Sequence, residues 1–497
     1  MKRFICMILL MISLPLWGAE VIPDTQLVLL KNESPLIAFR IAFLTGSAED
    51  PSGKEGVAAL TASLVAEGGT QKHEYQQILQ LLFPMAAGYS SQVDKEMTVF
   101  VGVVHKDHLN AFYELLRDAI LTPAFKKEDF ERLKTDQLNY VTKSLRFSND
   151  EELGKETLNW AIFKGHPYGH PDAGTAGGIQ SITLQDVKGF YQDQFTRKNL
   201  VIGVAGNYPQ DLIQKLKQDF SKLPAGTTGK KSLPPAPKIE SVHVVIVEKK
   251  TPATAFSFGY PISFTRANED YFPMMVMNSW LGQHRTHVGR LYNVMREQRG
   301  LNYGDYSYME HFAFGGSFYQ PPPNFSRHQQ IFQVWIRPVP HPVRHFALRQ
   351  AVREVQMLAD KGLAQKDLRE IRNFLLNYMV SLAQSNSELL GYALDDYFYK
   401  LPKSYFDLSK QNFESLNLNQ VNAAIKKHLS MKNMVIAVVT EDAEGFKKAL
   451  VENTPSPIKY DSPKPEEILE EDKLIMNFPL TIKAENITII PADKIFE

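Results

Sequence analysis

The stretch Asn199-Leu-Val-Ile-Gly-Val-Ala205 reveals how the chain is organised, because it has a counterpart in Asn433-Met-Val-Ile-Ala-Val-Val439. Both stretches are apolar runs of strand length, and each is followed by a segment whose apolar residues have helical spacing. Similarity at a long internal interval indicates a duplicated structural unit. The simplest interpretation is two homologous halves of about 200 residues each.

The regions around these stretches supply the boundaries of the two halves. Residues 224–240 are rich in proline and glycine and have no apolar periodicity, which is typical of a linker. The predicted halves are therefore residues 20–223 and 241–453. Residues 454–497 form a C-terminal extension with several prolines and an acidic run, and nothing in it predicts a function.

The first residues have the pattern of an export signal. Residues 1–19 begin with Met-Lys-Arg, continue with an apolar run and end in Trp17-Gly-Ala, which is typical of a secretory signal peptide. We therefore expect a periplasmic or secreted protein. Its one cysteine, Cys6, lies in this segment, so the mature chain should have no disulfide and no thiol nucleophile. No later apolar run reaches the roughly 18 residues of a transmembrane helix, so we expect no integral membrane segment.

The charge balance excludes several classes of partner. The chain of 497 residues has 55 Lys and Arg against 55 Asp and Glu. A balanced chain has no general attraction for polyanions, so nucleic acid is not an expected partner. The sequence also lacks a Gly-x-Ser-x-Gly nucleophile turn and a phosphate-binding loop.

The segment Gly289-Arg-Leu-Tyr-Asn-Val-Met-Arg-Glu-Gln-Arg-Gly-Leu-Asn-Tyr303 carries the clearest chemical pattern. Its apolar residues recur at helical spacing, and Gly300 is expected to end the helix. Arg296 lies on the last predicted turn, and Tyr303 follows seven positions later. A turn of this length can bring a guanidinium and a phenol to one side of a cleft, where they would hold a peptide carbonyl. A structural reading stays open, because cations also stabilise helix C-termini.

Within this segment, Leu-Tyr-x-x-x-Arg-Glu-x-x-Gly-Leu-x-Tyr resembles the signature of the C-terminal half of the pitrilysin/insulinase family of zinc peptidases. The resemblance covers both halves of the chain. It implies an α+β clamshell of two similar halves, each a mostly antiparallel sheet with helices on one face. It also implies that Arg296 and Tyr303 bind the substrate backbone beside the zinc.

The zinc-binding motif of the family is degenerate in this chain. In active members, the first helix carries His-x-x-Glu-His, whose histidines bind zinc and whose glutamate is the general base. The matching helix here is Gly56-Val-Ala-Ala-Leu-Thr-Ala-Ser-Leu-Val-Ala-Glu-Gly-Gly-Thr70, which places Ala59, Ala62 and Ser63 at those positions. Alanine has no lone pair for a metal, and a serine hydroxyl is a weak zinc ligand. We therefore expect no metal and no catalytic residue in this chain.

Substitute metal ligands are not evident. The family's third ligand is a downstream Glu, and the region where it is expected offers only Asp136, Gln137 and Asn139. Close histidine pairs occur at His105/His108, His166/His170, His284/His287 and His341/His345. The pair His284/His287 is the best of these, but no nearby carboxylate completes it, and a catalytic zinc needs three protein ligands.

Two features of the sequence are suited to holding a substrate. Residues 87–95 resemble the family's edge strand, which pairs with an extended peptide through main-chain hydrogen bonds. The predicted pairing positions are Gly88, Tyr89, Ser90 and Ser91, although a plain hairpin strand is an equal alternative. An aromatic run after Tyr303 would line a chamber wall or, as is more common, a core: Tyr306, Tyr308, Phe312, Phe314, Phe318 and Tyr319.

Together these features predict an exported, non-catalytic, insulinase-like subunit. It would bind a peptide substrate and supply Arg296 and Tyr303 to the active site of a zinc-bearing partner subunit, with no cofactor of its own. Two alternatives stay open: a stand-alone peptide-binding or structural protein, and a metallopeptidase with an atypical metal site.

Overall fold

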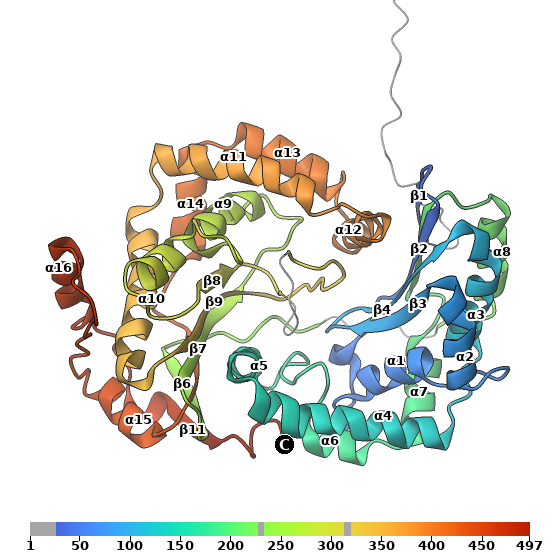
Figure 1. Ribbon diagram of the computed structural model, residues 1–497, viewed down its shortest axis with the longest axis horizontal. Coiled ribbons are helices and arrows are strands. Elements are labelled where there is room, and N and C mark those ends of the chain that lie inside the picture. The colour runs from blue at the N-terminus through green and yellow to red at the C-terminus, as the bar shows by residue number, and fades with distance from the viewer. Residues whose placement is uncertain (1–25, 227–232, 313–319) are drawn as a thin grey trace, which may run out of the picture.

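The computed structural model describes residues 26–226, 233–312 and 320–497 and contains two β-sheets in opposite halves of the molecule (Figure 1). The expected signal peptide, residues 1–19, lies outside the described residues, as does part of the predicted linker. Both sheets mix parallel and antiparallel neighbours and pack against helices, so the fold is α+β, as expected.

The N-terminal sheet has five strands in the order β1-β5-β2-β4-β3. β1 runs parallel to β5, and the other neighbouring strands are antiparallel. The strands are β1 (Gln26–Lys31), β2 (Leu36–Phe43), β3 (Gly88–Val93), β4 (Thr98–His105) and β5 (Leu200–Gly206).

The C-terminal sheet has six strands in the order β11-β6-β10-β7-β9-β8, with β6 parallel to both β10 and β11. They are β6 (His243–Glu248), β7 (Thr254–Ile262), β8 (Asp305–Tyr308), β9 (Gln330–Val339), β10 (Val435–Thr440) and β11 (Ile487–Pro491). Apart from β11, the order repeats that of the N-terminal sheet strand for strand. The two similar stretches of sequence form β5 and β10, which have equivalent places, so the strand order agrees with the predicted duplication.

Helices surround the two sheets. The N-terminal half contributes α1 (Val57–Glu67), α2 (Tyr75–Leu82), α3 (Leu109–Leu121), α4 (Lys127–Asn139), α5 (Asp150–Ile162), α6 (Ala176–Ser181), α7 (Leu184–Gln194) and α8 (Asp211–Phe220). The remainder are α9 (Tyr271–Gly282), α10 (Arg344–Lys361), α11 (Gln365–Ser381), α12 (Asn386–Tyr399), α13 (Tyr405–Ser415), α14 (Leu418–His428), α15 (Ala443–Val451) and α16 (Glu466–Ile475). Two π-helical segments, η4 (Tyr140–Ser148) and η5 (Tyr292–Glu297), and several single 3₁₀ turns complete the described elements.

Each sheet is covered on both faces, because one helix of each half packs on the sheet of the other half (Figure 1). α5 packs on β7 and β10, where Leu158 shares a buried cluster with Val435. α12 packs on β2 and β5, where Leu390 shares one with Val201. The expectation of helices on one face is therefore corrected. The physical reason is that β5 and β10 are buried along their whole length, and such strands need apolar cover on both faces.

A buried charge network also joins the halves at the turn of the β3–β4 hairpin. Arg327 Nε donates to Asp94 Oδ2 at 2.8 Å, and Arg327 Nη2 lies 3.3 Å from Asp172 Oδ2. His328 Nδ1 lies 2.8 Å from Glu96 Oε2. Burial raises the pKa of Asp94 to about 6, although the neighbouring Arg327 lowers it. The Arg327 guanidinium of the C-terminal half thus compensates the charge of carboxylates of the N-terminal half at this contact.

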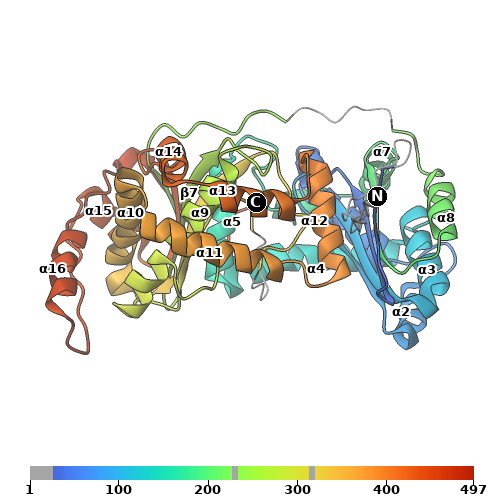
Figure 2. The same ribbon diagram turned by 90° about the horizontal axis from the view of Figure 1, so that it is seen from above.

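The described part of the linker, from residue 233 on, runs along the outside of the molecule, as the view from above shows (Figure 2). The described end of the linker packs on the N-terminal half, where His166 Nε2 lies 3.0 Å from the Pro234 carbonyl oxygen. Among the described residues, no helix has both the length and the apolar character needed to cross a membrane.

The C-terminal extension is part of the packed structure. β11 pairs with β6 at the edge of the C-terminal sheet, and α16 packs beside α10. The last residues reach the N-terminal half: Arg146 Nε donates to the Ile495 oxygen at 2.8 Å, and Ala176 N donates to the Phe496 oxygen at 2.8 Å. The extension therefore contacts both halves.

Candidate functional site

The helix that matches the family's zinc-binding helix is α1, which packs against strand β3 and helix α4. Asp50 holds its first turn, because the Asp50 carboxylate accepts hydrogen bonds from Gly56 N at 2.6 Å and Ala58 N at 2.8 Å. Ala62 is fully buried, and Ala59 and Ser63 are half-buried. The helix is present, whereas its three chemical positions carry no side chain suited to zinc.

The α4 region, where a third ligand was sought, is structural. Gln137 Nε2 donates to the backbone oxygens of Gly56 and Ala173 at 2.9 and 2.8 Å, which ties α4 to the start of α1. Asp136 is exposed and Asn139 is half-buried. Within the described ranges, no group of three or more His, Cys, Asp or Glu side chains is arranged to hold a metal ion. These residues therefore do not fit a catalytic zinc, which needs three protein ligands.

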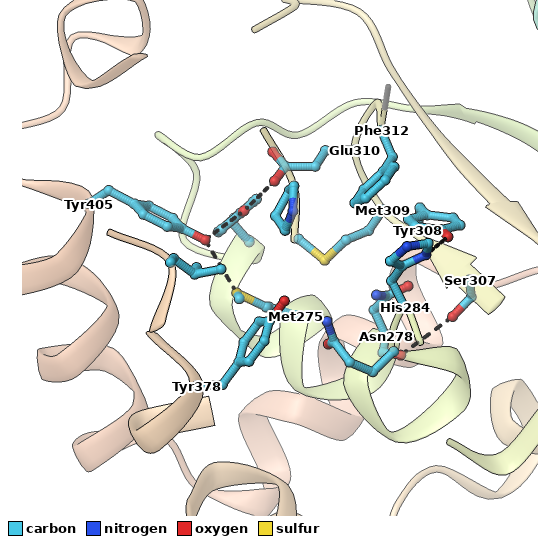
Figure 3. A pocket seen from close by; sticks show the side chains of 14 residues that line it. Met275, Asn278, His284, Ser307, Tyr308, Met309, Glu310, Phe312, Tyr378 and Tyr405 are labelled. Atoms are coloured by element: carbon cyan, nitrogen blue, oxygen red, sulfur yellow. Dashed lines mark hydrogen bonds between the residues drawn. The ribbon is translucent and has the colours of Figure 1, made fainter. Parts of the chain in front are cut away.

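His284 and His287 hydrogen-bond to two different tyrosines. His284 Nδ1 pairs with the Tyr308 hydroxyl (Figure 3), and His287 Nδ1 lies 2.8 Å from the Tyr292 hydroxyl. The other histidine pairs also contain rings with protein partners: His105 Nδ1 accepts from Asp107 N, His166 Nε2 lies near the Pro234 oxygen, His170 Nδ1 lies near the Pro171 oxygen and His341 Nε2 lies near the Thr251 oxygen. These contacts explain the rings without a metal.

A pocket of about 60 Å³ lies beside His284 (Figure 3). Its wall is mainly aromatic and thioether: Tyr271, Met275, Tyr308, Met309, Phe312, Tyr378 and Tyr405. Tyr306, Tyr308 and Phe312 also pack with Trp335 in a buried cluster, so this part of the predicted aromatic run belongs to the core. Phe314, Phe318 and Tyr319 lie outside the described residues.

The structure brings Arg296 and Tyr303 together. Arg296 lies in η5, and its Nη1 donates to the Tyr303 backbone oxygen at 3.2 Å. The Arg296 guanidinium carbon lies 4.9 Å from the centre of the Tyr292 ring and 5.7 Å from that of Tyr303. Tyr303 is 75% exposed, and the Arg296 side chain is 35% exposed. A cation and a phenol therefore lie side by side at the surface, held by stacking.

The predicted pairing strand is β3, at the edge of the N-terminal sheet. Gly88 and Ser90 are exposed, and Tyr89 and Ser91 are half-buried. β3 pairs with β4 on one side only, and among the described residues no strand pairs with its other side. An edge of this kind presents backbone N–H and C=O groups to an extended peptide. Its counterpart in the C-terminal sheet is β8, which begins two residues after Tyr303.

Sequence reasoning missed one residue of this region, Arg299. Its side chain is fully buried, with Nε 2.8 Å from Asp472 Oδ1 and Nη2 2.8 Å from Glu471 Oε2. Both acids belong to α16 in the C-terminal extension. The sequence contains an acidic run in the extension and several arginines around Arg296, but no pattern in it indicates that these two segments are in contact.

Comparison with known protein families gives two matches. The description "Insulinase (Peptidase family M16)" matches residues 27–176, and "Peptidase M16 inactive domain" matches residues 181–375. A Helicobacter pylori protein named "Non-peptidase homolog YmxG" is 22% identical over 453 residues, or 88% of this chain and 99% of that protein. A Bacillus subtilis protein named "Uncharacterized zinc protease YmxG" is 22% identical over 282 residues, or 56% of this chain and 66% of that protein.

Solved structures share the fold. A peptidase M16 inactive domain from Pseudomonas fluorescens superposes with a TM-score of 0.74 at 22% identity, covering 85% of this chain and 96% of that one. A protease from Helicobacter pylori gives a TM-score of 0.71 at 15% identity, covering 86% and 100%. A chain of complex III2 from Candida albicans gives 0.67 at 13% identity, covering 85% and 96%.

Proposed function

The chain belongs to the M16 (insulinase) peptidase family. Within this family, we propose that it is an exported, non-catalytic subunit. In this proposal it binds an extended peptide and completes the active site of a zinc-bearing partner subunit of the same family. The two halves of this chain would form one wall of a clamshell-like chamber, and the partner subunit would form the other. This chain would hold no zinc.

One observation supports the proposal: the helix that matches the zinc-binding helix is present without zinc ligands or a general base, while the Arg296 and Tyr303 side chains lie together at the surface. α1 retains its capped first turn and its packing on β3, yet Ala59, Ala62 and Ser63 offer neither zinc ligands nor a general base. Arg296 and Tyr303 lie together and reach solvent. In the proposal, Arg296 and Tyr303 orient the substrate, and the zinc-bearing partner activates the water.

The two side chains suit a peptide carbonyl. A guanidinium and a phenol are both hydrogen-bond donors, and the stacking of Arg296 on Tyr292 and Tyr303 limits the positions that its donors can take. Donors aimed at an oxygen on which negative charge develops stabilise the transition state more than the bound substrate. Removal of one such donor typically costs about 3 kcal/mol, roughly a hundredfold in turnover.

The first test concerns metal. We expect the purified mature protein, after dialysis, to contain no stoichiometric zinc and to hydrolyse no peptide. One tightly bound zinc per chain, together with proteolysis that a chelator abolishes, would refute the proposal and favour an atypical metallopeptidase.

The second test concerns the pair of residues. The mature chain is mixed with a zinc-bearing subunit from the same organism that carries His-x-x-Glu-His, and assembly is measured by light scattering before peptide hydrolysis. Arg296→Ala and Tyr303→Phe should each assemble normally and lose roughly a hundredfold in turnover. Arg369→Ala, at an exposed arginine of α11, is the matched control and should keep full activity. Full activity of both site variants would show that the pair has only a structural role.

A stand-alone peptide-binding protein is the second candidate, and the open edge of β3 favours it. It predicts that fluorescent peptides bind the isolated chain without hydrolysis and that no zinc-bearing subunit co-purifies. The substitution Ser90→Pro should then weaken binding, because a proline within an edge strand disturbs the main-chain pairing that an added peptide would extend.

A further inference from the structure

The extension helix α16 contacts the segment that carries Arg296 through buried ion pairs. α16 lies on the outer flank of the C-terminal half, away from the N-terminal sheet (Figures 1 and 2). Its residues Glu471 and Asp472 both bind the buried guanidinium of Arg299, each at 2.8 Å. Arg353 of α10 also lies 3.0 Å from Glu471, and the Tyr460 hydroxyl donates to Asp472 at 2.7 Å. The two carboxylates are therefore fixed by several partners.

Arg299 connects the two carboxylates of α16 to the backbone of η5. Its Nη1 donates to the backbone oxygen of Val294 at 3.0 Å, and Gln350 Nε2 donates to the same oxygen at 3.1 Å. A second contact comes from Lys464, whose Nζ donates to the Gln298 oxygen at 2.7 Å. A π-helical segment departs from the regular α-helical ladder and often marks a functional site. Here Arg299, and Gln350 of α10, donate to a backbone oxygen within η5, and Lys464 of the extension donates to that of the residue that follows η5.

We propose that α16 is a positioning element for the substrate-binding pair. Glu471 and Asp472 hold Arg299, Arg299 holds η5, and η5 sets the direction of Arg296 and of the turn that ends in Tyr303. This inference rests on the proposed function, because it assigns to the extension the task of orienting that pair. The two family matches end at residue 375, so they do not cover the extension.

The physical reason for such a device is the exposure of the pair. Arg296 and Tyr303 lie at the surface and are held by ring contacts and one backbone hydrogen bond within their own segment, so the backbone of this segment determines where their donors lie. A donor misplaced by about 1 Å can cost roughly a hundredfold in rate. A buried, charge-assisted network placed behind the segment restrains the backbone without occupying the substrate side. The charges matter, because hydrogen bonds to ionised groups are about twice as strong as neutral ones.

The first experiment uses the isolated mature chain and hydrogen exchange followed by mass spectrometry. In the double variant Glu471→Gln/Asp472→Asn, side-chain shape is kept and charge is lost. We expect amide exchange in residues 292–303 to quicken about tenfold or more, while exchange in residues 57–67 of α1 stays unchanged. The matched control is Glu466→Gln/Glu467→Gln, at the exposed start of the same helix, which should leave both regions unchanged. Unchanged exchange in residues 292–303 of the first variant would overturn the proposal.

The second experiment measures turnover in the complex reconstituted with a zinc-bearing subunit. Glu471→Gln/Asp472→Asn should lower kcat about tenfold with little change in KM, because only the orientation of transition-state donors is disturbed. In the Arg296→Ala background, the same double change should have no further effect on kcat. An equal fall in both backgrounds would mean a general structural role and would refute the inference. If Arg296→Ala alone leaves turnover unchanged, the proposed function is refuted. The hydrogen-exchange experiment is independent of that outcome and still decides whether α16 restrains η5.

Discussion

Replacement of Arg327 by methionine tests the buried contact between the halves. Arg327 is 3% exposed and binds Asp94, which is fully buried, through two hydrogen bonds. Arg327→Met keeps an apolar stem and removes the charge, so Asp94 loses its principal cation. Removal of one partner of a buried ion pair typically costs 3–5 kcal/mol, because an uncompensated charge remains. We expect a loss of about this size in the free energy of unfolding at pH 8.

The pH dependence of this loss follows from the pKa of Asp94. That pKa is about 6 with Arg327 present, above the ordinary value for aspartate, because burial outweighs the attraction of the cation. Loss of Arg327 removes the lowering influence, so the pKa rises further. Native protein then holds a proton that the unfolded chain releases, and stability falls as pH rises by at most about 1.4 kcal/mol per pH unit. The loss caused by Arg327→Met should therefore be smaller at pH 5.5 than at pH 8.

Urea unfolding followed by circular dichroism at the two pH values is the measurement. Adding Asp94→Asn to Arg327→Met should recover much of the loss at pH 8, because a neutral amide needs no counter-charge. Arg369→Met, at an exposed position of α11, should stay within about 0.5 kcal/mol of the parent protein. A loss below about 1 kcal/mol, or one of equal size at both pH values, would contradict the reasoning.

Three further predictions concern stability. Burial and two neighbouring arginines lower the pKa of His345 to about 3. The unfolded chain, with a His345 pKa near 6.5, therefore binds a proton before the folded chain does, so the free energy of unfolding falls as the pH is lowered from about 6.5 towards 3. His345→Leu should flatten the acid side of the stability profile, by at most about 1.4 kcal/mol per pH unit, whereas the exposed control His108→Leu should not. Leu158→Ala and Leu390→Ala each truncate a side chain on a helix that covers the other half's sheet, and each should lower the free energy of unfolding by about 2–5 kcal/mol. The control Leu474→Ala, at a 63% exposed position, should change it little. Calorimetry should also give one thermal transition for both halves, and two separate transitions would contradict the mutual cover of the sheets.

Much of the fold could be predicted from local patterns. The similar stretches that form β5 and β10 indicated two related halves, and the strand order of the two sheets agrees with that duplication. The exchange of α5 and α12 between the halves was not predicted, because it is a contact between residues far apart in sequence. The uninterrupted apolar character of β5 and β10 was its one signal, since central strands with two covered faces read as continuous apolar runs. The π-helical form of η5 gave no signal, because its apolar spacing is also that of an α-helix.

The candidate site divides in the same way. The motif containing Arg296 and Tyr303 predicted that the two would lie together, and the structure places them in contact through a backbone hydrogen bond and ring stacking. Stacking of Arg296 on Tyr292 was not part of the prediction, although the two residues are four apart, a spacing that makes them neighbours on a helix. The link from Arg299 to Glu471 and Asp472 was also missed, since no local pattern reports an ion pair across more than 170 residues. The roles of the pair in substrate binding stay predictions.

The cover of the N-terminal sheet by α12 has a consequence for synthesis of the protein. When β5 leaves the ribosome, all five strands of that sheet exist, but α12 is encoded about 190 residues further along the chain. At roughly 5–20 residues per second, the apolar face later covered by Leu390 waits about 10–40 s for its helix. During that interval the nascent chain should be a strong client for chaperones, and a message truncated before α12 should yield an aggregating product rather than a folded half.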